Sequence, residues 1–159
     1  MLAQVGEAVR VAAACRPERA PAQDRPSYAF NKDRGQYNAA AVLRRLAALR
    51  GRRDGLPVLG ITDADLFEPE SPYVLGDADR SDQSAVVSLA RLRGEQPVPP
   101  EQLRHRVAAE AVHQLGHLLG LLHCQDSRCA MYPSQRPSDA DRKQPALCRP
   151  CRAAAGLEG

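Results

Sequence analysis

The sequence predicts an α/β or α+β fold whose C-terminal end is stabilised by metal. Three features support this prediction: two amphipathic helical patterns, apolar strand-like segments between them, and a cysteine-rich tail without hydrophobic periodicity. A chain of 159 residues, 43% of them hydrophobic, is typical of one folded domain or of one domain with a small appendage. Aliphatic side chains must fill the core, because tryptophan is absent and only 4% of residues are aromatic.

The first half of the chain predicts a strand, a helix and a second strand. Residues 5–15 alternate loosely between apolar and polar side chains, and we expect a strand there. Residues 36–50 place alanine and leucine at helical spacing before Gly51, which predicts a helix that ends at this glycine. Residues 56–67 are apolar and β-branched and are bounded by turn residues, so they predict a strand.

The second half predicts two more strands and a long helix. Residues 73–76 are short enough for an edge strand, whereas the continuous apolar middle of 84–92 suits a central, buried strand. From Glu101 to Leu119, apolar residues recur at helical spacing, and we expect Gly120 to end this helix.

Charge and hydropathy favour a cytoplasmic protein. The net charge of +3 is modest, and its basic residues are mixed with acidic ones, so we expect no nucleic-acid partner. The N-terminus lacks the pattern of a signal peptide, and no segment approaches the roughly 18 apolar residues that cross a bilayer. We therefore expect no membrane partner, and the sequence does not indicate an oligomeric state.

Three of the four histidines, His113, His117 and His123, fall within eleven residues. On a helix, the first two project from one face and can occupy two corners of a tetrahedral zinc site. His123 can join them only if the chain turns, and Gly120 stands where a left-handed residue is least costly. We predict that the three imidazoles bind one zinc ion; the alternative is that they merely lie on an amphipathic helix. We expect His105 to lie on the same helix without binding the metal.

Four of the five cysteines, Cys124, Cys129, Cys148 and Cys151, stand in the tail. The C-x4-C and C-x2-C spacings predict a closed four-thiolate zinc site, which is structural because no coordination position stays open. Two disulfides are the alternative, but a cytoplasmic location disfavours them. A redox role for the C-x2-C pair is disfavoured because no thioredoxin-like strand precedes it. We expect the distant Cys15 to be a bystander.

These motifs together resemble a known family. The stretch from His113 to His123 matches the metzincin signature H-E-x-x-H-x-x-G-x-x-H at every position except the second. Its continuation, HQLGHLLGLLHCQDSRCAM followed by DADRKQPALCRPC, is similar to the combined histidine and cysteine motif of the archaemetzincins. The upstream segments RGQYNAAAVLRRL, LGITDADLF, YVLGDADR and SAVVSLARL also resemble that family, so the likeness covers most of the chain.

The resemblance implies a metzincin-like domain with a twisted mixed sheet, flanking helices, an active-site helix and a small zinc-bound C-terminal subdomain. It places the N-terminal subdomain with the active-site helix at 1–123 and the C-terminal subdomain at 124–159. It also implies a zinc-dependent metallopeptidase with two zinc ions per chain and a peptide or protein substrate. An edge strand around 73–76 would then line the cleft and pair with an extended peptide.

Two further side chains are candidates for the histidine site. By its spacing after the third histidine, Met131 matches the methionine turn that forms an apolar floor beneath the metal in metzincins. Ordinary packing is the alternative. Tyr132 could reach the metal or a bound oxyanion, although a solvent-facing tyrosine in a loop is commonplace.

The family pattern has glutamate where this chain has Gln114. A carboxylate beside a zinc-bound water accepts its proton and passes it to the leaving amine, whereas an amide cannot accept a proton. We therefore expect zinc binding and peptide docking to persist, and hydrolysis to be weak or absent. The glutamine could be natural, engineered, or compensated by another carboxylate. Glu110 lies one turn earlier, where a structural ion pair is the expected role.

Three functions follow from these residues. The first is a zinc peptidase with reduced activity, and the second is a non-catalytic peptide-binding pseudo-enzyme on the same scaffold. The third is a zinc-stabilised module that binds nucleic acid through the arginine-rich end at 148–152, which the even mixing of charges argues against.

Overall fold

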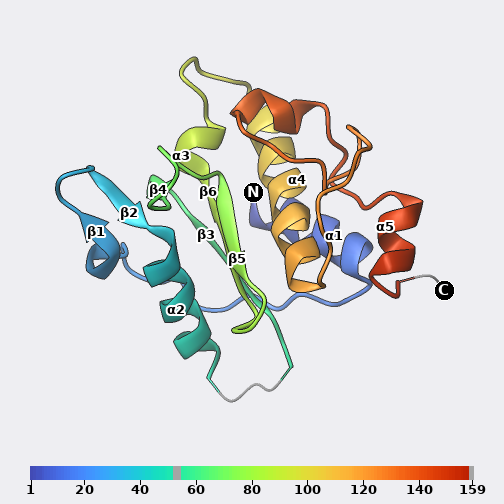
Figure 1. Ribbon diagram of the computed structural model, residues 1–159, viewed down its shortest axis with the longest axis horizontal. Helices are drawn as coiled ribbons and strands as arrows, with labels where there is room; N and C mark the ends of the chain where they lie inside the picture. The colour runs from blue at the N-terminus through green and yellow to red at the C-terminus, as the bar shows by residue number, and fades with distance from the viewer. Residues whose placement is uncertain (52–54, 158–159) are drawn as a thin grey trace.

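The computed structural model describes residues 1–51 and 55–157. Its elements are, in chain order, α1 (Leu2–Ala13), η1 (Ser27–Ala29), β1 (Phe30–Asn31), β2 (Gln36–Asn38), α2 (Ala39–Arg50), β3 (Val58–Thr62), β4 (Leu66–Phe67), β5 (Gly76–Asp79), β6 (Ser84–Ser88), α3 (Leu89–Leu92), α4 (Pro100–Leu118), η2 (Pro137–Asp141) and α5 (Arg149–Ala154). Helix α2 lies on one side of the central sheet, and α4 lies on the other with α1 packed against it (Figure 1). The predicted α/β class, with helices flanking a mixed sheet, is confirmed.

The central sheet has the strand order β3-β6-β5. Strand β6 runs parallel to β3 and antiparallel to β5, so that Val86 lies opposite both Gly60 and Asp77. Ala85 and Val87 pack in the layer of α1 and α4, whereas Val86 packs in the layer of α2. Every residue of β6 is buried because helices cover both faces, which confirms the prediction of a central strand.

Two predicted strands are shorter in the structure because serine or threonine side chains turn the chain. The segment 56–67 divides into β3 and β4, which belong to different sheets. Between them, the Thr62 hydroxyl accepts a hydrogen bond from the backbone N–H two residues later, at 3.1 Å. The segment 84–92 ends as a strand at Ser88, whose hydroxyl caps the short helix α3 in the same way.

A second, small sheet of β1, β2 and β4 was not predicted. Strand β2 occupies the first residues of the predicted helix 36–50, so α2 begins only at Ala39. The side chain of Asn38 fixes this start by accepting the N–H of Ala41 at 2.9 Å, as an N-cap residue does. The helix ends at Gly51 with a positive φ of 62°, as predicted.

The predicted strand at 5–15 is wrong, because residues 2–13 form helix α1. Its buried residues Val5, Val9 and Ala12 recur at helical spacing and face the core. Alanine is the best helix former and is abundant here, so propensity and the wider period outweigh the loose alternation.

The outer strand beside the cleft is β5, so the predicted edge strand starts three residues later than expected. Only Gly76 is shared between the predicted segment 73–76 and the observed strand. Upstream of it, Val74 forms an isolated antiparallel bridge with Leu66 of the small sheet. The edge of β5 that faces away from β6 has no neighbouring strand among the described residues.

The cysteine-rich tail packs directly on the helices. Ala12 of α1 and Val112 of α4 form one buried cluster with Met131 and Leu147, and the four tail cysteines contact or belong to this cluster. The subdomain boundary between residues 123 and 124 stays a prediction. No helix in the described part of the chain is long and apolar enough to span a bilayer.

An ion pair joins η2 to α4, and it gives a first prediction. Arg106 and Asp141 form two hydrogen bonds of 2.7 Å, and the Arg106 side chain is 6% exposed. The Arg106 guanidinium holds the pKa of Asp141 below its usual range. We expect Asp141→Asn to lower the free energy of unfolding by about 1.5–3 kcal/mol at pH 7, because it leaves a buried cation without its charged partner.

Urea unfolding at a fixed zinc concentration measures this difference. The matched control is Asp33→Asn, an exposed aspartate in the β1–β2 turn, for which we expect a change within about 0.5 kcal/mol. Equal effects of the two substitutions would contradict the assigned role of the pair.

Candidate metal centres

Helix α4 and the turn after it bring the three predicted histidines together. His113 and His117 lie one turn apart, with their Nε2 atoms 3.0 Å from each other. Gly120 has a φ of +86° and turns the chain, so that the ring of His123 lies 5.3 Å and 5.2 Å from the other two ring centres. A side chain at position 120 would also meet the Arg80 guanidinium at 2.8 Å. The left-handed conformation therefore favours glycine here, and any larger residue would also displace the Arg80 guanidinium.

Main-chain carbonyls orient two of these imidazoles. His113 Nδ1 lies 2.7 Å from the Ala130 oxygen, and His117 Nδ1 lies 3.0 Å from the Leu121 oxygen. Because a carbonyl can only accept, each Nδ1 carries the proton and each Nε2 keeps its lone pair for a metal. Burial and the nearby charge of Lys143 lower the pKa of His113 to about 3, so this imidazole is neutral, as a metal ligand must be.

The spacing of the imidazole nitrogens fits a zinc ion. One ligand nitrogen from each histidine lies within 4.8 Å of the others. Two nitrogens bound at about 2.1 Å to a tetrahedral ion stand about 3.4 Å apart. Small side-chain adjustments therefore suffice to seat the ion. Three protein ligands leave one position open for water or substrate.

Met131, the candidate for the methionine turn, packs on α4 between His113 and His117. It is fully buried, and its sulfur packs so closely on Gly116 of α4 that no Cβ fits there. Tyr132, for which a contact with the metal and a solvent-facing position were the alternatives, is half-buried and is not among the described residues that line the cleft.

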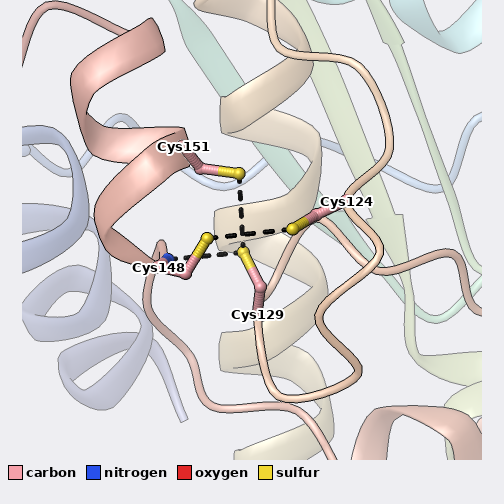
Figure 2. A group of neighbouring side chains, drawn as sticks. All are labelled: Cys124, Cys129, Cys148 and Cys151. Atoms are coloured by element: carbon pink, nitrogen blue, oxygen red, sulfur yellow. Dashed lines mark hydrogen bonds between the residues drawn. The ribbon is translucent and has the colours of Figure 1, made fainter.

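The four tail cysteines converge on a second centre (Figure 2). Their sulfurs lie 3.7 Å apart for Cys124 and Cys148, and 3.8 Å apart for Cys129 and Cys151. These separations are far beyond a disulfide bond but equal the sulfur spacing around a tetrahedral zinc with bonds of about 2.3 Å. Burial raises the pKa of the Cys129 thiol, so an ion would have to displace its proton. Cys15 is exposed and outside the cluster.

Gln114 belongs to a buried polar network on the same face of α4 as His113 and His117. Its Nε2 donates to Glu110 Oε1 at 2.7 Å, and both side chains are almost completely buried. Lys143 has no exposed surface, and its Nζ lies 3.9 Å from Glu110 Oε2. Glu110 therefore forms a structural ion pair, as expected. The sequence did not indicate the role of Lys143, because a lysine in a polar tail normally has a solvated side chain.

His105 also has a structural contact. Its Nε2 lies 2.8 Å from the Lys143 carbonyl oxygen and donates to it, which ties the tail to the first half of α4. The ring is outside the group of three metal-binding candidates.

A cleft of about 890 Å³ lies against the histidine cluster. It is bounded by β5 and the segment before it, by α4, and by residues 133–135 of the tail. The Tyr73 hydroxyl donates to the Gln135 carbonyl at 3.0 Å and so joins two of these walls. Burial and the neighbouring Glu68 carboxylate raise the pKa of Asp77 in the edge strand to about 6, a feature that the sequence did not indicate.

Comparison with known proteins decides the family. The family model described as peptidase family M54 matches residues 16–155. The chain belongs to this family, the archaemetzincins. It is 38% identical over 134 residues to the archaemetzincin of Methanocaldococcus jannaschii, covering 82% of this chain and 72% of that protein. It is 43% identical over 126 residues to that of Methanopyrus kandleri, covering 79% of this chain and 69% of that protein.

Solved structures agree with this assignment. The crystal structure of the Methanopyrus kandleri archaemetzincin matches with a TM-score of 0.86 and 36% identity, over 98% of this chain and 83% of that one. A zinc-dependent peptidase from Methanocorpusculum labreanum matches with a TM-score of 0.86 and 28% identity, over 95% and 91% of the two chains. The predicted family and fold are therefore confirmed, and the M54 relatives support a zinc-dependent metallopeptidase.

Metal content gives a second prediction. We expect the M54 chain, purified with zinc, to hold two ions, and His117→Ala to hold one, because two imidazoles bind zinc much more weakly than three. Elemental analysis per chain measures both values. The matched control is His105→Ala, which should keep two ions; retention of both ions in His117→Ala would refute the ligand assignment.

The contact of Gly116 with Met131 gives a third prediction. Gly116→Ala should lower the free energy of unfolding by about 1–3 kcal/mol, because its Cβ would overlap the buried methionine sulfur. Gly6→Ala in α1 is the matched control, since its Cβ would make only an ordinary contact at 3.7 Å. Alanine favours helix over glycine, so Gly6→Ala should be neutral or stabilising by up to about 1 kcal/mol in urea unfolding. A neutral Gly116→Ala would contradict the tight packing.

Proposed function

We propose that this archaemetzincin is a zinc-dependent peptidase in which the glutamine at the general-base position leaves hydrolysis weak or absent. The observation that supports the proposal is the position of Gln114 beside three convergent imidazoles, in a cleft bounded by a strand edge that no other described strand pairs with. The same glutamine also supports a second form of the proposal, in which the protein binds peptides but does not cleave them.

The two donor sets support two zinc ions per chain. His113, His117 and His123 would hold the ion of the active site, and the four cysteines would hold a structural ion. The first ion would supply Lewis-acid chemistry and a bound water of lowered pKa. The four-thiolate set also supports a cytoplasmic location, because free thiols persist in reducing compartments.

Strand β5 would position the substrate. The edge that no described strand pairs with offers backbone N–H and C=O groups to an extended peptide, which could pair with it as an additional strand. Gly76 and Asp77 of this strand line the cleft beside Gln114. A Cβ at Gly76 would lie 2.9 Å from Gln114 Nε2, so the glycine lets the edge strand pass close to the reaction centre.

Gln114 can bind but cannot move a proton. Its amide nitrogen already donates to Glu110, which leaves the amide oxygen to accept a hydrogen bond from water or from a substrate N–H. The absence of a general base typically lowers the rate by about 10²–10⁴-fold. Glu110 is a poor substitute, because it is 3% exposed and is already engaged with Gln114 and Lys143.

The test is peptide cleavage by the wild type, by Gln114→Glu and by a swapped double variant. A glutamate at 114 would face the Glu110 carboxylate at the present 2.7 Å, where like charges repel. The double variant Glu110→Gln/Gln114→Glu keeps one amide and one carboxylate in this pair. We therefore expect the swap to raise turnover by about 10²–10⁴-fold over the wild type, and Gln114→Glu alone to gain less.

Zinc content and peptide affinity are the controls for this experiment. If the swapped variant binds zinc and peptide as the wild type does but cleaves no faster, the chain is the peptide-binding pseudo-enzyme. If neither protein binds peptide, both forms of the proposal are refuted.

A further inference from the structure

The histidine and cysteine clusters are connected through two short segments of backbone. His123 and Cys124 are consecutive residues, and each is a candidate ligand of a different cluster. Cys129 is followed by Ala130, whose carbonyl accepts the hydrogen bond from His113 Nδ1 at 2.7 Å. Both clusters therefore depend on the conformation of residues 123–131.

The Ala130 carbonyl is itself held by the second half of the cysteine site. Ala130 N–H donates to the Ala146 oxygen at 3.0 Å, two residues before Cys148. Cys148 N–H in turn lies 3.4 Å from Cys129 Sγ and donates to it. The two tail segments that supply the thiolates thus fix the group that orients a histidine ligand.

Met131 provides a second connection. Its carbonyl accepts the N–H of Cys124 at 3.0 Å, and its side chain packs on α4 at Gly116, one residue before His117. Any movement of residues 124–131 would therefore disturb both the orientation of His113 and the packing of Met131 on Gly116, next to His117.

Lys143 joins this arrangement to α4. Its Nζ donates to the Ala130 oxygen at 3.0 Å, the same atom that orients His113, and the Glu110 carboxylate 3.9 Å away offsets its charge. Its own carbonyl is bonded to His105. The lysine is fully buried, so its ammonium can satisfy its hydrogen bonds only within the protein.

We infer that metal binding at the two clusters is cooperative: an ion on the four cysteines fixes Cys129–Met131 and thereby raises the metal affinity of the three histidines, with Lys143 as a positioning residue. This inference rests on the two zinc sites of the proposed function. The segment 124–131 contains no helix or strand, so an ion on the thiolates of Cys124 and Cys129 would restrict its motion and hold the Ala130 carbonyl in place. Loss of such an orienting contact typically lowers metal affinity about 10–100-fold.

The first experiment measures cobalt affinity at the histidine cluster by its visible absorption, in competition with a chelator. Cadmium, which prefers thiolates, first fills the cysteine cluster of the wild type. We expect Cys148→Ser to bind cobalt at the histidines about 10–100-fold more weakly than the cadmium-loaded wild type does. Cys15→Ser, with its cysteine cluster intact, is the matched control and should equal the wild type. Affinities of Cys148→Ser and wild type within about two-fold would refute the coupling.

The reciprocal experiment does not depend on the folding of a cysteine variant. Cadmium affinity of the cysteine cluster is measured in the wild type with zinc on its histidines and in His123→Ala, which keeps all four cysteines. Thermodynamic linkage requires the same factor in both directions. An unchanged cadmium affinity would refute the coupling and leave both zinc sites intact, whereas failure of the wild-type histidines to bind any metal would refute the proposed function itself.

The role of Lys143 needs a variant that leaves no buried charge unpaired. The double variant Glu110→Gln/Lys143→Met removes both charges at similar volume, and the glutamine can still accept from Gln114. We expect this variant to bind both ions. The factor by which an ion on the cysteines raises the metal affinity of the histidines, the coupling factor, should be several-fold smaller than in the wild type. If Lys143 has only a structural role, the double variant would have a lower free energy of unfolding but an unchanged coupling factor. That result would refute the positioning role of Lys143.

Discussion

The left-handed turn at Gly120 is the constraint on which the functional part of this molecule depends. A straight helix can present His113 and His117 on one face but carries position 123 past them, so the third imidazole requires a sharp change of chain direction. The φ of +86° at Gly120 supplies this change, and the Arg80 guanidinium occupies the space that a side chain would need. Because Cys124 follows His123 directly, the same turn also sets where the cysteine cluster begins.

The two clusters could be predicted from sequence because their chemistry is local and uncommon. Three histidines around a glycine and four cysteines at ligand spacing rarely occur except in metal sites, and the structure brings both groups together. The fold was less predictable where local patterns were weak. Residues 5–15 show a loose alternation that is overruled by alanine-rich helix propensity and by packing of Val5 and Val9 on the core. The small sheet of β1, β2 and β4 has two or three residues per strand, too few for a periodic signal.

The groups that orient the histidines could not be predicted, for a different reason. Two of them are main-chain carbonyls, at Ala130 and Leu121, and every residue has such a group whatever its side chain. The third is Lys143, whose surroundings in the sequence are polar and indicate a solvated surface. Its burial is possible only because Glu110 lies on the α4 turn that the tail crosses, a long-range pairing that neither segment reveals alone.

The buried network also changes what the glutamine at position 114 means. If Gln114 stood alone, replacing a glutamate by an amide would simply delete a proton acceptor. Here the amide nitrogen satisfies one oxygen of a buried carboxylate whose other oxygen has only Lys143 nearby. Burial raises the pKa of Glu110, and the Lys143 charge and the Gln114 hydrogen bond oppose that rise. A second carboxylate at 114 would add a negative charge beside Glu110, whose own charge Lys143 already offsets, so an ion on the three histidines would have to balance it. Glutamine therefore suits the electrostatics of this interior, because its amide satisfies the Glu110 carboxylate without adding a second charge.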